Sequence, residues 1–419
     1  MADRPGLALR LWLAATWALQ PLLPWHLKRR VARGKEEPAR WHEKLGQPGA
    51  VRPDGRLIWL HAVGLGEVLA LRGLISRLAL LEPDIHFLVT SNTRTSAEVF
   101  ARNLPPRTIH QFAPLDTPGA ARHFLAHWRP DLSIWAEQEL WPGLVFRTDA
   151  AGIPLALVNA RMNDAAFARR QKGAALYRDI LPRFRLISAQ DDTTALHLAS
   201  LGAPRVSTDG SLKPLAPPLA DAPETRTALS AQIGTRPLWL CASSHPPDEA
   251  LSLAAHKALL TTLPDALLIL APRLIDRAPA IRAAIETAGL TCAQRGKSEP
   301  IKAETQVYLA DTFGELGLFY RLAPAAFIGG TLNEIEGHNP WEAAQLGCAI
   351  LHGPRTANFA ADFAALDTAN AARLAERPDE LTAALTDPDL PATAARATAL
   401  TRANMDRLDH LCQKLVELL

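Results

Sequence analysis

From residue 57 onward, short apolar runs alternate with longer segments of helical periodicity, such as 67–81 and 119–127. An unbroken apolar run is typical of a parallel strand that helices cover on both faces, because neither side of such a strand meets water. The alternation therefore predicts an α/β fold built on a parallel sheet. The first predicted strands are Leu57–Ala62, Ile85–Ser91, Thr108–Ala113, Leu132–Ala136, Pro154–Asn159 and Leu186–Ala189.

The alternation stops at residues 214–223, which read PLAPPLADAP. Proline fixes φ and lacks a backbone N–H, so this run fits neither a helix interior nor a central strand, and it predicts a linker. We therefore expect two Rossmann-like domains that face a common cleft, at 51–213 and 224–419. The second series of predicted strands is Leu238–Ala242, Ala266–Ala271, Gln306–Ala310, Ala325–Ile328 and Ala349–Leu351.

The first 50 residues have a different pattern. Residues 7–25 are apolar with three tryptophans, and the following stretch at 26–44 carries seven Lys or Arg residues against three Glu. A secretory signal has its positive charge before the apolar stretch, so this order argues against export. Tryptophans followed by a basic cluster favour a segment at 1–50 that lies in the cytoplasmic leaflet against anionic lipid. The alternative is a buried core helix followed by a solvated charged loop.

Composition narrows the function further. Lys and Arg total 45 against 43 Asp and Glu, and the net charge of +2 is too small to indicate a nucleic-acid-binding protein. The four cysteines form no CxxC pair and the thirteen histidines form no HExxH motif, which argues against a zinc site and a disulfide scaffold. We therefore expect neither a metal nor a separate cofactor.

Polar side chains follow the predicted strands of the first half. Glu67 enters a helix after the glycine turn of HAVGLGEV, where the helix dipole favours a carboxylate that could serve as a general base. The alternative is a glutamate that only caps the helix. AEQELWPG places Glu137 and Glu139 directly after the predicted strand Leu132–Ala136. Lys213 lies beside the linker, where it could bind an anion. VNARMN at 158–163 ends a further strand.

The second half carries groups suited to a nucleotide. Arg273 closes a strand with a guanidinium fork suited to phosphate, and Glu342 begins a helix, where it could accept hydrogen bonds from ribose hydroxyls. N–H groups at the start of a helix can bind a phosphate, and paired glycines, which have no side chain, let the backbone come close to it. Each motif is weak alone, but their positions at consecutive strand ends predict a nucleotide site. The other candidate residues there are Ser244, His245, Gly329, Gly330 and His338.

These motifs, in this order, resemble those of the 3-deoxy-D-manno-octulosonic acid (Kdo) transferases of lipopolysaccharide assembly. The resemblance covers nearly the whole chain, and the succession of DTFGEL, GGTL and GHNPWEAA is its most specific part. The other matching segments are RGKEEPARWHEKLG at 33–46, HAVGLGEV, ELWPG, VNAR, GSLK, SSHPPDE, APR and GPRTANF at 353–359.

The resemblance implies an inverting glycosyltransferase of the GT-B type on the cytoplasmic side of the inner membrane. CMP-Kdo would be its donor, as a substrate and not a cofactor, and a lipid A precursor its acceptor. Glu67 would be the general base, while Lys213 and Glu139 would stabilise the transition state. The residues that would contact CMP are Pro272, Arg273, Phe313, Gly314, Glu315, Asn339, Pro340, Trp341 and Glu342.

Four positions depart from the family pattern. Gly64 replaces a serine, Leu274 replaces a histidine, Glu336 stands where glycine is common, and Trp341 replaces a smaller apolar residue. These differences touch the predicted donor pocket and leave an alternative open: an inactive or altered-specificity CMP-sugar-binding paralogue at the same membrane. A nucleotide-sugar epimerase or hydrolase is a third reading, which the apolar and basic N-terminus disfavours.

Overall fold

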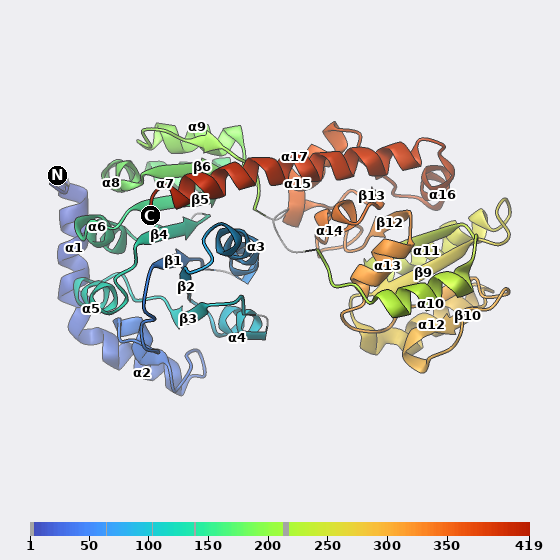
Figure 1. Ribbon diagram of the computed structural model, residues 1–419, viewed down its shortest axis with the longest axis horizontal. Helices are drawn as coiled ribbons and strands as arrows, with labels where there is room; N and C mark the ends of the chain where they lie inside the picture. The colour runs from blue at the N-terminus through green and yellow to red at the C-terminus, as the bar shows by residue number, and fades with distance from the viewer. Residues whose placement is uncertain (1–3, 64, 103, 138–139, 213–217) are drawn as a thin grey trace. The chain divides into compact units, whose positions relative to one another are not determined.

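The computed structural model describes residues 4–63, 65–102, 104–137, 140–212 and 218–419. The chain divides into two compact units, and Figure 1 labels their elements. Unit 1 comprises residues 1–217 and 404–419, and unit 2 comprises residues 218–403.

Unit 1 is built on a parallel sheet with the strand order β3-β2-β1-β4-β5-β6-β7. This is the doubly wound order of a Rossmann fold. Strands β2 and β3 are added on one side of β1, and β4 to β7 are added on the other side, so the strand order reverses between β1 and β4. The predicted strands are confirmed to within one residue at each end, while β7 was not predicted. The strands are β1 (Leu57–His61), β2 (His86–Ser91), β3 (Thr108–Phe112), β4 (Leu132–Ala136), β5 (Leu155–Ala160), β6 (Leu186–Ala189) and β7 (Ser207–Thr208).

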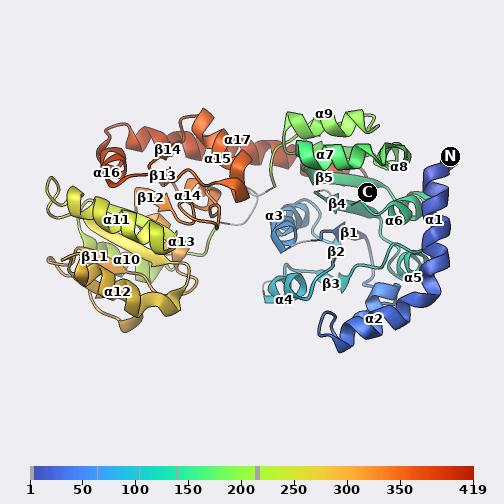
Figure 2. The same ribbon diagram turned by 180° about the vertical axis from the view of Figure 1, so that it is seen from behind.

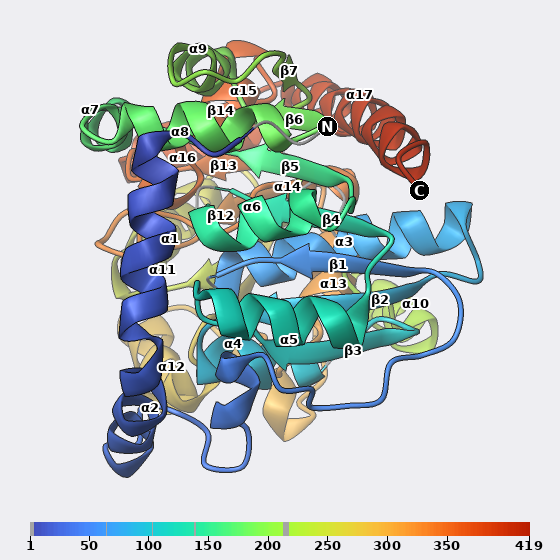
Figure 3. The ribbon, with the colours of Figure 1, turned by 90° about the vertical axis from the view of Figure 1, so that its left-hand side faces the viewer.

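Helices cover both faces of this sheet. On one face, strand residues such as Trp59 and Trp135 pack against α5, α6 and α8, and α1 lies across these helices (Figure 3). On the other face, Ile58 and Val89 pack against α3 and the last turns of the chain. The helices are α1 (Leu7–Leu19), α2 (Leu23–Ala32), α3 (Leu65–Leu81), α4 (Arg94–Arg102), α5 (Pro118–Trp128), α6 (Pro142–Ala150), α7 (Asp164–Gln171), α8 (Ala174–Ile180) and α9 (Asp192–Ser200).

The segment RGKEEPARWHEKLG ties the N-terminal helices to the sheet through buried charges. Glu36 accepts from Arg30 and Lys44, both at 2.6 Å, and Glu43 pairs with Arg40 at 2.7 Å. Both glutamates are almost fully buried, and removing Glu36 would leave the buried Lys44 without its partner. This segment therefore acts as a structural clamp, and three cations of the predicted basic stretch are neutralised within it.

Unit 2 repeats the same architecture. Its parallel sheet has the order β10-β11-β9-β8-β12-β13-β14, with the reversal between β8 and β12. The five predicted strands are present, and the short β10 and β14 were not predicted. The strands are β8 (Leu238–Ser244), β9 (Leu267–Pro272), β10 (Cys292–Gln294), β11 (Val307–Leu309), β12 (Ala325–Ile328), β13 (Ala349–His352) and β14 (Ala372–Leu374).

The two faces of this sheet carry separate helix layers. Helices α10, α13, α14 and α15 pack on one face, and α10 and α13 lie in front of the sheet in Figure 1. Helices α11, α12 and α16 pack on the other, which Figure 2 turns toward the viewer. The helices are α10 (Pro223–Ile233), α11 (Pro246–Leu259), α12 (Ala278–Thr287), α13 (Leu316–Leu322), α14 (Trp341–Gln345), α15 (Ala360–Thr368), α16 (Pro378–Thr386) and α17 (Leu390–Val416).

The C-terminal end corrects the predicted domain boundary at 224–419. Helix α17 begins in unit 2, but residues 404–419 belong to unit 1, because Leu408, Leu411 and Leu415 are buried in its core. The predicted linker is also shorter than expected where the structure describes it, since Pro223 is already the first residue of α10. Proline is favoured there because the first helical N–H needs no partner.

Candidate functional site

The residues predicted to contact a nucleotide come together at one edge of unit 2. Ser244 ends β8, Pro272 ends β9, and Gly329 follows β12 directly. Because all three strands are parallel, their carboxyl ends meet at the same edge, where ligands bind in open α/β sheets. The prediction that these motifs converge is therefore confirmed for the geometry of unit 2.

A pocket of about 90 Å³ opens at this edge. Pro272 and Arg273 line it from β9, and Phe313 and Gly314 line it from the loop after β11. The Phe313 side chain is 85% exposed, so its aromatic face is available to a flat apolar group. The Arg273 N–H donates to Ser244 O at 3.0 Å, which fixes the backbone beneath its exposed guanidinium.

Glu315 is held beside this pocket by a residue that the sequence analysis missed. Arg295 donates to it through two parallel bonds, Nε to Oε2 at 3.0 Å and Nη2 to Oε1 at 2.8 Å, and Thr312 also donates to it. The guanidinium lowers the pKa of Glu315, which is therefore ionised at neutral pH. Arg295 lies in the short helical turn after β10, and no motif marks it.

The GHNPWE turn places Glu342 at the start of α14. Its carboxylate accepts from Asn339 Nδ2 at 3.5 Å, and Asn339 Oδ1 in turn accepts the Trp341 N–H at 3.1 Å. Burial raises the pKa of Glu342 to about 7, an effect that Asn339 and the Arg273 charge partly offset. Glu342 is thus poised to change its charge near neutral pH.

The Trp341 side chain is part of the core of unit 2, and the predicted contact of this residue with CMP stays a prediction. Its indole is buried in the core of unit 2, and its Nε1 donates to Asp362 at 2.8 Å. The large side chain fills the space beneath α14, so it supports the turn from below. Pro340 is also buried and forms the N-cap of the helix.

The two glycines after β12 allow the strand ends to meet closely. A Cβ on Gly329 would lie 2.4 Å from Ser243 O, and Gly330 has a positive φ of 74°. Asp248 joins the two sides, because its Oδ2 accepts the N–H of His245 at 2.9 Å and that of Gly330 at 2.8 Å. Burial raises the pKa of this carboxyl to about 6.

The helix that follows the SSHP segment, α11, cannot bind an anion through the N–H groups of its first two residues. Its first two residues, Pro246 and Pro247, have no N–H to donate. The following Asp248 places a carboxylate at that end, which is itself unfavourable for an anion. The polar side chains that face this point are His245 and His338, whose Nε2 atoms lie 3.0 Å apart.

The structure describes none of the side chains of the three predicted catalytic residues. Glu139 and Lys213 lie outside the described residues, and Glu67 lies in the first turns of α3, whose side chains there are not described. Their roles therefore stay predictions.

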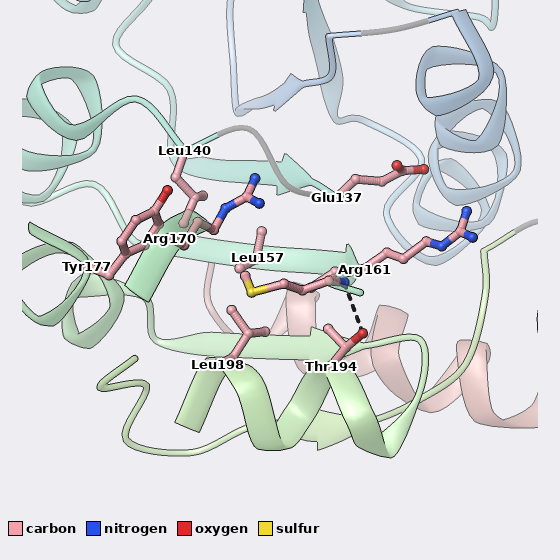
Figure 4. A pocket seen from close by; sticks show the side chains of 10 residues that line it. Glu137, Leu140, Leu157, Arg161, Arg170, Tyr177, Thr194 and Leu198 are labelled. Atoms are coloured by element: carbon pink, nitrogen blue, oxygen red, sulfur yellow. Dashed lines mark hydrogen bonds between the residues drawn. The ribbon is translucent and has the colours of Figure 1, made fainter. Parts of the chain in front are cut away.

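Other polar groups do gather at the carboxyl edge of unit 1. Glu137 has a positive φ of 62° and accepts from Asn159 Nδ2 at 3.4 Å, while Asn159 Oδ1 accepts the Leu212 N–H at 3.0 Å. Glu137 and Arg161 extend beyond the ends of β4 and β5, at one side of a small pocket (Figure 4). The strained backbone at Glu137 and Asn159 is typical of functional positions.

His61, the first residue of HAVGLGEV, is a core residue. Its ring packs edge-on against Trp135 and Trp141, with centroids 4.7 and 5.1 Å away, and Nδ1 lies 2.9 Å from Thr90 Oγ1. Burial lowers its pKa to about 3, so it is neutral. Among the residues that the structure describes, no cluster of His, Cys, Asp and Glu has the makings of a metal site.

Comparison with known proteins agrees with this architecture. The family profile described as "3-Deoxy-D-manno-octulosonic-acid transferase (kdotransferase)" matches residues 39–216. A probable mitochondrial 3-deoxy-D-manno-octulosonic acid transferase of Arabidopsis thaliana is 35% identical over 86% of this chain and 83% of its own. The 3-deoxy-D-manno-octulosonic acid transferase of Bordetella pertussis is 34% identical over 93% of both chains.

A solved structure gives the fold independently. UDP-GlcNAc 2-epimerase from Neisseria meningitidis aligns with a TM-score of 0.55 over 86% of this chain and 99% of its own, at 10% identity. Such low identity shows the shared architecture and nothing about the substrate.

The paired Rossmann-like units and these relatives define the class of the protein, which is a glycosyltransferase of the GT-B type. Within that class, the chain belongs to the 3-deoxy-D-manno-octulosonic acid transferase family, as its similarity over most of its length to two such transferases shows.

Proposed function

We propose that this protein transfers Kdo from CMP-Kdo to a lipid A precursor with inversion at the sugar. Family membership supports the transferred sugar. The observation that carries the donor assignment is the pocket of unit 2, which Arg273 and Phe313 line at the strand ends, with Glu315 in the same loop as Phe313.

The chemistry of this pocket suits a cytidine monophosphate. The exposed Phe313 ring offers a stacking face for a pyrimidine, and the Arg273 guanidinium can meet a phosphate with paired N–H groups. The ionised Glu315 and the carboxyl of Glu342 can each accept a hydrogen bond from a ribose hydroxyl.

In the proposed reaction an acceptor hydroxyl attacks the anomeric carbon of Kdo in a single displacement. Glu67 takes the proton of that hydroxyl, and the bond between the anomeric carbon and the phosphate oxygen breaks with its electron pair going to CMP. Lys213 and Glu139 would stabilise the transition state, Lys213 by opposing the charge that develops on the phosphate. In this proposal the reaction uses no separate cofactor.

We place the protein at the cytoplasmic face of the inner membrane, held by residues 1–50. Leu11, Trp17, Leu22 and Trp25 are all more than half exposed along α1 and α2, an unusual amount of apolar side chain for water. Arg29 stacks over the Trp25 ring at 5.5 Å, so aromatic and cationic groups share this surface, as anionic lipid favours. No helix among the described residues combines the length and hydropathy needed to span a bilayer.

The test is to incubate the full chain with CMP-Kdo and a tetraacyl lipid A precursor and to weigh the product. We expect the acceptor to gain the mass of one or more Kdo residues, with CMP released only when both substrates are present. Glu67→Gln should abolish transfer and leave CMP binding intact, because Gln cannot accept the proton. Full activity of E67Q would remove Glu67 from the mechanism, and CMP binding without transfer by the natural chain would favour an inactive paralogue.

A further inference from the structure

The imidazoles of His245 and His338 meet head-on at the donor edge of unit 2. Their Nε2 atoms are 3.0 Å apart, their ring planes differ by only 9°, and their centroids are 5.3 Å apart. Five-membered rings with bonds of about 1.35 Å have a radius of about 1.15 Å. The centroid separation therefore equals the Nε2 contact with one ring radius at each end, which describes an in-line hydrogen bond and excludes face-to-face stacking.

This geometry restricts the protonation of the pair. A hydrogen bond between two Nε2 atoms requires a proton on one of them and a lone pair on the other. The neutral pair therefore has one Nδ1–H, and a pair that gains a proton has an N–H at both Nδ1 atoms and one proton shared between the rings. The two residues can hold only one positive charge together, and they titrate as one unit.

One carboxylate, that of Asp248, joins the two backbone segments near the rings. Asp248 accepts the N–H of His245 and that of Gly330, and Gly330 O accepts the N–H of Gly337 at 2.8 Å, next to His338. The backbone that carries the two rings is thus joined at the ends of β8 and β12.

Burial, and after it the neighbouring charges, keep the pair neutral when no anion is present. Burial, the Arg273 charge and the partner ring lower the pKa of His338 to about 4, and burial lowers that of His245 as well. Arg273 and Arg277 also oppose a charge on His245, whereas Glu249 favours it. The neighbouring Asp248 has a raised pKa, and Glu249 is paired with Arg277 at 2.7 Å. An anion beside Arg273 would offset the repulsion from this guanidinium and would itself attract a positive charge on the pair.

We propose that His245 and His338 act as a single proton-sharing pair that takes up a proton when the phosphate of a cytidine nucleotide binds beside Arg273. This rests on the donor assignment proposed above. The charge matches the reaction: when the sugar leaves, the phosphodiester with one negative charge becomes a monoester with up to two. The electron pair of the broken bond stays on the phosphate oxygen, and the pair meets the added charge with a proton drawn from solvent.

Calorimetry of the full chain tests this directly. CMP is titrated near neutral pH in buffers of different ionisation enthalpy, and the slope of the observed enthalpy against buffer enthalpy gives the protons taken up. We expect the natural chain to take up more protons than H338Q or H245Q, by up to one per CMP. Its affinity for CMP should also rise as the pH falls toward 6, by at most about tenfold per pH unit, and less steeply in the variants.

Three controls make the outcome decisive. H410Q removes an exposed imidazole of unit 1 and should match the natural chain. Cytidine, which lacks the phosphate, should cause no extra uptake, and circular dichroism should show that the variants are folded. Equal proton uptake by the natural chain and folded H338Q would overturn the pair while leaving the donor assignment intact. If the natural chain failed to bind CMP, the donor assignment itself would be contradicted, and with it the proposal that rests on it.

Discussion

At the residue scale, the proposed donor pocket is organised by side chains that bind one another without a ligand. Arg295 and Thr312 hold the Glu315 carboxylate from two sides, and Asn339 orients Glu342. A carboxylate with a fixed rotamer loses less entropy when it accepts a hydroxyl, so this ordering should appear as affinity. The arrangement assigns Arg295 a positioning role although it lies at the margin of the pocket.

Replacing Arg295 by methionine should weaken CMP binding about tenfold, the equivalent of ~1.4 kcal/mol, because Glu315 would lose its fixed orientation. Calorimetry with CMP measures the change. The matched control is Arg282→Met, which breaks the pair with Glu299 at 2.9 Å on the same side of the unit and should leave CMP affinity unchanged. Equal losses in both variants would point to general destabilisation.

At the element scale, the N-terminal helices are tied to unit 1 by polar contacts while their apolar side chains stay exposed. Trp12 Nε1 donates to Asp116 Oδ2 at 2.7 Å, and Asp116 also accepts the N–H groups of Gly143 and Leu144 at the start of α6. The only side chain of α1 buried in the described structure is Leu9. Helix α1 is therefore docked along one edge with its apolar surface turned outward.

This surface carries the membrane contact that we propose, and a vesicle assay tests it. Replacing Trp17 and Trp25 together by glutamate should reduce co-sedimentation with vesicles of anionic phospholipid at least tenfold, because both rings are exposed and would otherwise enter the interface. The control replaces Leu80 and Leu196, which are exposed elsewhere in unit 1, by glutamate. Binding that survives the tryptophan changes, or falls equally in the control, would contradict a membrane surface at α1 and α2.

Elements were easier to predict from the sequence than contacts between them. Central strands were found because both of their faces are buried, whereas β7, β10 and β14 are two or three residues long at or near a sheet edge and have too little apolar sequence to detect. The position of Pro272 and Arg273 at the carboxyl edge could be predicted because they lie at the end of an apolar strand. Arg295 was missed, because its pairing with Glu315 depends on how β10 and α13 pack.

At the scale of the whole molecule, helix α17 serves both units. Its residues up to Ala403 belong to unit 2, and those from Asn404 on complete the core of unit 1 with Leu408, Leu411 and Leu415. Arg77 of α3 pairs with Asp409, which fixes the register of this packing. The sequence could not show that the end of α17 packs on unit 1, because the apolar pattern of a helix does not indicate which sheet the helix covers.

Leu411→Ala should therefore destabilise unit 1 by about 2–5 kcal/mol, since it removes a fully buried side chain and leaves a cavity. Hydrogen exchange followed by mass spectrometry should show faster exchange in β1, β2 and α3, while the strands of unit 2 keep their protection. Met405→Ala, at a half-exposed position of the same helix, serves as the control. Faster exchange spread evenly over both units would show that they unfold together.

The same helix sets an order for folding during synthesis. All residues of unit 2 leave the ribosome before the last sixteen residues of the chain, while unit 1, although it is made first, lacks part of its core until those residues emerge. The half of the protein that begins the chain is thus the last to be finished. A truncated product that ends before Asn404 would carry a complete unit 2, while the core of unit 1 would lack Leu408, Leu411 and Leu415.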